Sequence, residues 1–155
     1  MVKRNVDVKY RLIRADELSS LLALYQFLHE TDAPLPEEKQ LQQIWHDFLS
    51  DSKVHCLVAE VDNRLVATCI LTVIPNLTRG ARPYGLIENV VTHADYRQKG
   101  IGTKLLQYAQ DIARGKNCHK VMLITQRQLE STLRFYDNAG FQRNGKTAFV
   151  AYLDK

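Results

Sequence analysis

The chain has 155 residues with a net charge of +4, and 45% of its residues are hydrophobic while 25% are charged. These values are ordinary for a soluble globular protein and predict one domain that spans residues 1–155. They exclude a membrane-spanning helix, since no apolar run approaches the roughly 20 residues that a span needs, and they argue against nucleic-acid binding, since the basic residues form no stripe interleaved with aromatics.

The N-terminal part of the chain predicts one strand and two helices. Residues 9–14 alternate between polar and apolar side chains, as a half-buried strand does. Apolar residues then recur at helical spacing with Asp16 as the expected N-cap, and Pro34 and Pro36 end this helix. A second helix follows Pro36 and ends near residues 50–52. The apolar faces of the two helices consist of Leu18, Leu21, Leu22, Tyr25, Leu28, Leu41, Ile44, Trp45 and Phe48.

The middle of the chain predicts three strands. Residues 54–61 and 64–74 are rich in apolar and β-branched side chains, and only Asp62 and Asn63 separate them, which indicates a hairpin with a two-residue turn. A loop rich in turn residues follows at 75–83. The third strand is expected at residues 85–92.

The C-terminal half predicts two helices and three further strands. A helix is expected from about residue 102 to residue 114, and a short continuous apolar run at 120–125 is typical of a buried parallel strand. A second helix at 129–138 ends at Gly140, and residues 141–143 and 147–153 are expected to form the last strands. The chain therefore predicts an α/β fold (an α+β mixed sheet) covered by helices.

Cysteine usage and the N-terminus indicate a cytoplasmic protein. Cys56, Cys69 and Cys118 are odd in number, far apart and set in apolar stretches, so buried free thiols in a reducing compartment are expected. Residues 1–7 contain no apolar run of the kind found in secretory signals.

Residues 97–103, between the strand at 85–92 and the next helix, predict an anion site. A helix start presents backbone N–H groups without intrahelical partners at the positive end of the helix dipole, and Gly100 and Gly102 let a ligand approach the backbone. Phosphate or pyrophosphate suits such a site. A dinucleotide fingerprint would need a third glycine where Leu105 stands, and the glycine-lysine order of a P-loop is absent. An ordinary strand-to-helix turn is the alternative. Positive charge is added by Arg97, Lys99 and Lys104.

Two motifs closely resemble those of the GNAT superfamily of N-acetyltransferases. The acyl-CoA signature Gln/Arg-x-x-Gly-x-Gly/Ala matches residues 97–102, and the signature Phe-Tyr-x-x-x-Gly-Phe matches residues 135–141. The order of predicted elements also matches the family along nearly the whole chain. The resemblance implies a three-layer fold, with a central mostly antiparallel sheet that contains a parallel splayed pair and with helices on both faces.

The resemblance further implies acetyl-CoA as co-substrate. Its pyrophosphate would lie on the loop and helix start, and its pantetheine arm would pair with a strand edge freed by a bulge, which the sequence does not reveal. Many family members carry an Asn six residues before the Phe-Tyr pair, where this chain has Leu129, and Ser131 is a candidate substitute. The expected cofactor-binding residues are Val90, Val91, Thr92, Arg97, Gln98, Lys99, Gly100, Ile101, Gly102, Thr103 and Ser131.

Tyr136 is the candidate proton donor to the departing thiolate. It matches the tyrosine of the second family signature, and a phenol with a pKa of about 10 is a reasonable donor to a thiolate whose conjugate acid has a pKa of about 8.5–9. The alternative is a core aromatic residue beside Phe135 and Phe141.

Glu88 is the candidate base, acting directly or through water. It lies within an otherwise apolar strand, where an unpaired charge is costly and calls for a reason. Some small-amine acetyltransferases of the family carry an acidic residue in this place. The alternative is a structural hydrogen bond or salt bridge.

The expected acceptor site lies between the first two helices and the loop at 75–83. Asn89, Tyr25 and Arg127 are its candidate substrate-binding residues, although Arg127 fits a solvated loop position equally well. No metal-ligand spacing is present, so no metal is expected.

The leading hypothesis is an acetyl-CoA-dependent N-acetyltransferase that acts on a primary amine of a small molecule. The alternatives are a protein lysine or N-terminal acetyltransferase, and a non-catalytic acyl-CoA-binding sensor. The expected partners are acetyl-CoA and a small amine, without nucleic acid or membrane. Dimers are common in the family, and the residues leave the oligomeric state open.

Overall fold

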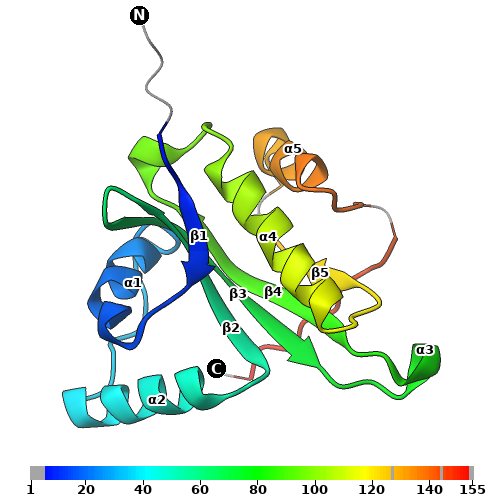
Figure 1. Cartoon of the computed structure of the whole chain (residues 1–155), viewed down its shortest axis with the longest axis horizontal. Helices are drawn as coiled ribbons and strands as arrows, with labels where there is room; N and C mark the ends of the chain where they lie inside the picture. Colours follow the sequence, from blue (N-terminus) through cyan, green and yellow to red (C-terminus); the bar gives the residue numbers. More distant parts are fainter. Residues whose placement is uncertain (1–5, 127, 144, 154–155) are drawn as a thin grey trace, which may run out of the picture.

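The described residues form one five-stranded sheet with the strand order β1-β2-β3-β4-β5 (Figure 1). The computed structural model describes residues 6–126, 128–143 and 145–153. The strands are β1 (Lys9–Leu12), β2 (Val54–Val61), β3 (Arg64–Ile74), β4 (Tyr84–Thr92) and β5 (Val121–Leu123). Neighbouring strands are antiparallel except β4 and β5, which are parallel. The predicted mixed sheet is therefore confirmed.

The β2–β3 hairpin closes through the predicted two-residue turn. Asp62 and Asn63 have φ angles of 48° and 62°, so both lie in the left-handed region. A turn of this kind matches the right-handed twist of the strands, and Asn and Asp tolerate it better than other side chains.

Helices cover both faces of the sheet. The N-terminal helices are α1 (Leu18–Tyr25), which follows a 3-10 turn (Ala15–Glu17), and α2 (Glu38–Ser50). The loop after β3 contains the short α3 (Thr78–Ala81), and a second 3-10 turn (Ala94–Tyr96) follows β4. The C-terminal helices are α4 (Ile101–Gly115) and α5 (Glu130–Asn138). The expected N-cap at Asp16 is wrong, because Glu17 instead accepts a hydrogen bond from the backbone N–H of Arg14 at 2.7 Å.

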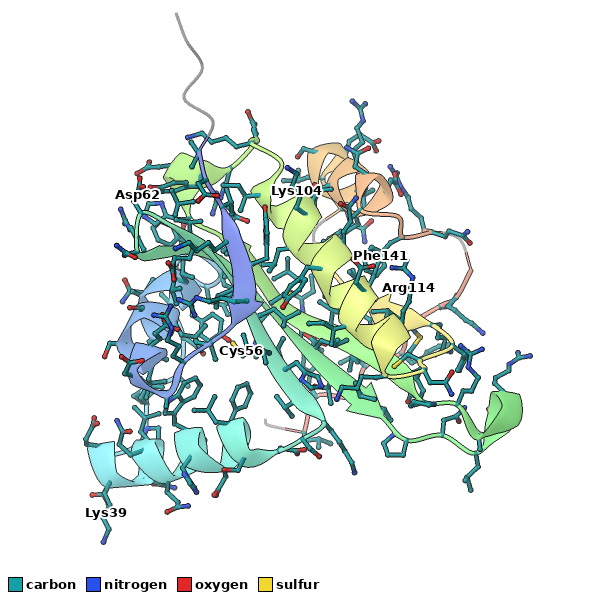
Figure 2. The ribbon with its side chains drawn as sticks, in the orientation of Figure 1. Lys39, Cys56, Asp62, Lys104, Arg114 and Phe141 are labelled. Atoms are coloured by element: carbon teal, nitrogen blue, oxygen red, sulfur yellow. The ribbon has the colours of Figure 1, made fainter. Side chains whose placement is uncertain are left out.

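Apolar side chains form clusters on both faces of the sheet. On one face α4 buries side chains against the strands, and we call this group the α4 cluster. On the other face α1 and α2 do the same, and Cys56 lies among their side chains (Figure 2). The α4 cluster includes Leu57, Leu71, Ile87, Leu105, Leu106 and Ala109. The opposite face contains an α1 cluster of Leu24, Val58, Leu65 and Val91. This arrangement confirms the three layers, and the three cysteines are free and buried as predicted.

A buried ion-pair cluster fastens the start of α1 to the sheet. Arg11 on β1 contacts Glu17 at 2.6 Å and also pairs with Glu60 on β2, whose exposed fraction is 4%. The Arg11 guanidinium holds the pKa of both carboxyls below their ordinary values by donating hydrogen bonds to their charged forms. The cluster therefore helps to fix the start of α1 against β1 and β2.

The parallel pair at the sheet edge separates after a few residues. β5 pairs with β4 only from Gly85 to Ile87. Beyond this point β4 continues to Thr92, so its edge facing away from β3 leaves the β5 ladder. This geometry confirms the splayed parallel pair that the resemblance implies.

The prediction of two strands at the C-terminal end is wrong. Residues 141–143 and 145–153 have no strand structure. Phe149 and Leu153 are 93% and 92% exposed, so the apolar side chains of this segment do not pack against the sheet.

No helix in the described part of the chain is long and apolar enough to cross a membrane.

Candidate active site

A β-bulge interrupts β4 next to the splayed edge. Glu88 pairs with Ile70 of β3, and Val91 pairs with Thr68, so two residues of β4 lie opposite the single residue Cys69. The two residues of the bulge are Asn89 and Val90, and Asn89 has a φ angle of 53°. The implied bulge is thus present, centred just before the expected stretch Val90–Thr92.

The bulge reverses which face each following side chain meets. In a regular strand, residues four apart share a face. Here Ile87 belongs to the α4 cluster, whereas Val91 belongs to the α1 cluster. The extra residue therefore brings Thr92 to the α4 side, where its hydroxyl lies beside Gly102 at the helix start.

A cleft of about 710 Å³ lies between this edge of β4, the loop before α4, and α5. Such a volume is ordinary for a small-molecule site. Ten of the expected cofactor-binding residues line the cleft, namely Val90, Val91, Thr92, Arg97, Gln98, Gly100, Ile101, Gly102, Thr103 and Ser131. Lys99, the remaining one, lies outside the lining.

The start of α4 presents an anion site to this cleft. Gly100 is the N-cap with a φ angle of 75°, and Gln98 before it has a φ angle of 59°. Lys104 N–H donates to the Gly100 carbonyl at 3.1 Å and so begins the helical pattern. The preceding N–H groups, up to that of Thr103, have no helical acceptor and lie at the positive end of the helix.

Two basic side chains of the loop bind the loop itself. Arg97 Nε donates to the Thr92 carbonyl at 3.0 Å, and Lys99 Nζ donates to the Asp95 carbonyl at 2.7 Å. Lys99 also lies 5.2 Å from the centre of the Tyr96 ring. These contacts hold both side chains along the loop and the turn before it. Figure 2 shows Lys104, which is exposed, near the start of α4.

Gly102 is required by close packing. A Cβ at this position would lie 3.0 Å from the Thr92 hydroxyl and 3.1 Å from the Phe135 ring. The absence of a side chain lets the helix start, β4 and α5 meet around the cleft. The residues therefore fit a ligand that carries a phosphate or pyrophosphate on this loop.

His93 anchors the turn that leads into the loop. Its side chain is buried, its Nδ1 accepts from the Asp95 N–H at 3.2 Å, and its Nε2 lies 2.8 Å from Arg64. The His93 ring also lies 4.4 Å from the ring of Phe27, which follows α1 and lines the cleft. The cleft thus also includes Phe27, Leu28 and Tyr96, which sequence reasoning did not assign to the cofactor. Phe27 and Leu28 were missed because they are distant from the loop in sequence.

Tyr136 lines the cleft from α5, on the same wall as Ser131. Its ring lies 4.9 Å from that of Phe135 and 6.3 Å from that of Phe141. The aromatic neighbours fix the ring against the core, while the tyrosine remains at the cleft wall. Both the proton-donor hypothesis and the core alternative have support here, because the residue is half-buried.

Glu88 and Asn89 lie on the opposite side of β4 from α4. Both are exposed, and the cross-strand partner of Glu88 is Ile70, which packs toward α1 and α2. Glu88 does not line the cleft, so its role as a base stays a prediction. The other acceptor candidate with a described position, Tyr25, also faces this side. Arg127 lies outside the described residues.

The described residues contain no group of three or more His, Cys, Asp or Glu side chains arranged to hold a metal ion. The cleft lining includes the hydroxyls of Thr92, Thr103, Ser131 and Tyr136.

The comparisons with known proteins agree with this geometry. A sequence model of the acetyltransferase (GNAT) family matches residues 18–141. A glucosamine 6-phosphate N-acetyltransferase of Trypanosoma brucei brucei is 35% identical over 88% of this chain and 90% of its own length. An N-alpha-acetyltransferase 30 of Schizosaccharomyces pombe is 32% identical over 49% of this chain and 50% of its own length. The structure of a putative acetyltransferase from Agrobacterium tumefaciens superimposes with a TM-score of 0.86 and 37% identity, covering 93% of this chain and 99% of that one.

Proposed function

The chain belongs to the acetyltransferase (GNAT) family, and we propose that it transfers the acetyl group of acetyl-CoA to the primary amine of a small molecule. The observation that carries the proposal is the cleft in which the bulged edge of β4, the helix start at Gly100–Thr103 and Tyr136 meet. Enzymes of this family use acetyl-CoA, which supports its pyrophosphate as the proposed ligand of the loop at 97–103.

The amine is proposed to come from a small phosphorylated amino sugar. The support is the T. brucei relative, whose name states glucosamine 6-phosphate as its substrate and which matches nearly the whole chain. The exposed Glu88 and Asn89 beside the bulge offer a carboxylate and an amide to such a polar acceptor.

The proposed reaction is direct attack. The neutral amine nitrogen adds to the thioester carbonyl carbon, a C–N bond forms, and the C–S bond breaks. A main-chain N–H at the bulge stabilises the developing oxyanion. Tyr136 gives its proton to the leaving thiolate, and the amine loses a proton to Glu88, directly or through water.

The test is a thiol-release assay with acetyl-CoA and a panel of amines. The panel contains glucosamine 6-phosphate, glucosamine, a lysine peptide and a peptide with a free N-terminus. Highest kcat/KM with the amino sugar phosphate supports the proposal. Preference for the N-terminal peptide would instead favour protein acetylation, to which the partial match with the S. pombe relative points. Binding of CoA without turnover of any amine would favour an acyl-CoA sensor.

Replacing Glu88 by glutamine is expected to change the pH dependence of kcat/KM. If Glu88 accepts the amine proton, its loss removes that acceptor, and the rate then depends more strongly on the fraction of amine that is already neutral. The measurement is the pH–rate profile of both proteins with the best amine of the panel. Asp95→Asn is a matched control, because Asp95 is also an exposed carboxylate near the loop. An unaltered profile in the Glu88 variant would eliminate the role.

We also propose that two copies of the chain associate through residues 147–153. Phe149, Tyr152 and Leu153 are at least 76% exposed, although this segment has the apolar pattern of a strand. β5 lies at the end of the sheet, and its outer edge has no strand partner among the described residues. An exposed apolar strand segment and an open edge complement each other, and adding the segment of a second copy would bury both.

The double substitution Phe149→Ser with Leu153→Ser is expected to convert a dimer into a monomer. It removes two large apolar groups from the proposed contact while leaving the described core untouched. The measurement is sedimentation velocity. Leu77→Ser is the matched control, because Leu77 is 93% exposed but lies in the loop after β3. A monomeric unsubstituted protein would contradict the proposal.

A cytoplasmic location is proposed as well. The support is the three cysteines, which are free and buried. Reduced thiols of this kind are usual in a reducing compartment.

A further inference from the structure

The conformation of the bulge depends on a residue with an unfavourable backbone angle. Asn89 has a φ angle of 53°, in the left-handed region that most side chains avoid and that Asn tolerates best after glycine. Residues held in this way cluster at functional sites, where the surrounding structure imposes the conformation. The sequence before and after Asn89 forms a regular antiparallel ladder with β3, so the bulge is confined to this point.

Tyr25, the last residue of α1, packs on the sheet face that Val91 meets directly after the bulge. Its ring contacts the α1 cluster, which includes Val91, and a further cluster of Leu21, Trp45 and Cys56. Burial raises the pKa of the Tyr25 hydroxyl above its ordinary value, and the Asn89 side chain acts on it in the opposite direction. The hydroxyl makes no hydrogen bond of ordinary geometry to a described residue, so the packed ring is the part of Tyr25 that can hold the strand.

We infer that Tyr25 and Asn89 are positioning residues, which hold the β4 bulge so that Val90–Thr92 face the cofactor cleft. The inference deepens the proposed function and rests on it. Asn89 supplies the left-handed backbone, and the Tyr25 ring packs in the same cluster as Val91, the next residue of β4 that pairs with β3. The same end of α1 leads directly to Phe27 and Leu28, which line the cleft, so one helix end supports both the bulge and the opposite wall.

This role differs from the substrate-binding role that the sequence suggests for both residues. A positioning role needs the backbone conformation of residue 89, whereas a substrate-binding role needs its amide group. Glycine adopts the left-handed region freely and lacks the amide, while alanine lacks the amide and disfavours that region. The two substitutions therefore separate the two roles.

The experiment measures CoA affinity by calorimetry and acetyl-CoA KM by steady-state kinetics. Asn89→Ala is expected to lower CoA affinity and to raise acetyl-CoA KM, each about tenfold, because the strand edge no longer matches the pantetheine arm. Asn89→Gly is expected to keep both values within about twofold of those of the unsubstituted protein. Asn117→Ala and Asn117→Gly are the matched pair, since Asn117 has a φ angle of 61° but lies after α4. This pair is expected to change the melting temperature without changing CoA affinity.

Equal CoA affinities in the two Asn89 variants would overturn the inference, and so would a higher acceptor KM in both. If Asn89→Ala does not fold, Tyr25→Leu decides. It is expected to weaken CoA binding about threefold, because it removes the ring that packs in the same cluster as Val91. Tyr25→Phe is the matched control, since it keeps the ring and loses only a hydroxyl without a hydrogen bond, and its CoA affinity is expected to stay unchanged. Unchanged CoA affinity in the Tyr25→Leu variant would show that Tyr25 does not position the bulge. CoA binding needs no acceptor, so these affinities test the positioning role even if the protein acetylates no amine and the proposed function fails.

Discussion

Tyr136→Phe is expected to lower kcat about a hundredfold or more while leaving acetyl-CoA KM nearly unchanged, since general acid catalysis typically contributes factors of this size. The ring stays in place, because phenylalanine keeps the contacts with Phe135 and Phe141 that hold Tyr136 at the cleft wall. The change therefore removes the proton donor without removing the packing. The measurement is the steady-state rate with the best amine acceptor, together with the thermal midpoint of unfolding.

The matched control is Tyr108→Phe. Tyr108 is also half-buried against the α4 cluster, but it lies on α4 beside Tyr10 and does not line the cleft. Its substitution is expected to leave kcat within about twofold, because it removes no group from the reaction. If Tyr136→Phe turns over as fast as the unsubstituted enzyme, Tyr136 is a core aromatic residue and the thiolate takes its proton from another source.

Gly102→Val is expected to abolish measurable CoA binding. A Cβ alone would already lie about as close as atoms can approach to the Thr92 hydroxyl and the Phe135 ring, and the two further methyl groups of valine must push β4 and α5 away from the helix start. Such overpacking commonly costs about 1–3 kcal/mol. The larger effect is expected on CoA affinity, because the N–H groups proposed to bind phosphate and the β4 edge proposed to pair with the pantetheine arm would move apart. The measurement is calorimetric titration with CoA.

Gly115→Val provides the comparison on the same helix. Gly115 ends α4, and a Cβ there would meet no atom within 4 Å. This variant is expected to bind CoA like the unsubstituted protein. CoA binding that survives in the Gly102 variant would show that the cofactor lies elsewhere than on this helix start.

Local patterns were sufficient to predict most of the fold. The two-residue turn at Asp62–Asn63, the helical spacing on α4 and the apolar run at β5 each depend on residues close in sequence. The loop at 97–103 was predictable for the same reason, because glycines that adopt special backbone angles and a helix start are local features. Six of its seven residues line the cleft.

The predictions were wrong where a segment needs a distant partner. Residues 147–153 have the composition of a strand, but a strand exists only when another strand accepts its hydrogen bonds. Glu88 was expected to be costly inside an apolar strand, yet the bulge and the splayed edge leave it exposed. The strand partner of residues 147–153 and the exposure of Glu88 both depend on contacts distant in sequence, so the neighbouring residues do not predict them.

The sequence by itself determined the family, the loop that suits a phosphate and the identity of Tyr136 as a candidate donor, because these are carried by short motifs. Only the tertiary structure decided that Asn89 and Val90 form a bulge, that Thr92 therefore turns toward Gly102, and that Tyr25 packs in the same cluster as Val91. Register and side-chain face are set by packing between β3, β4 and the helices on either side, since a single extra residue in a strand exchanges its two faces.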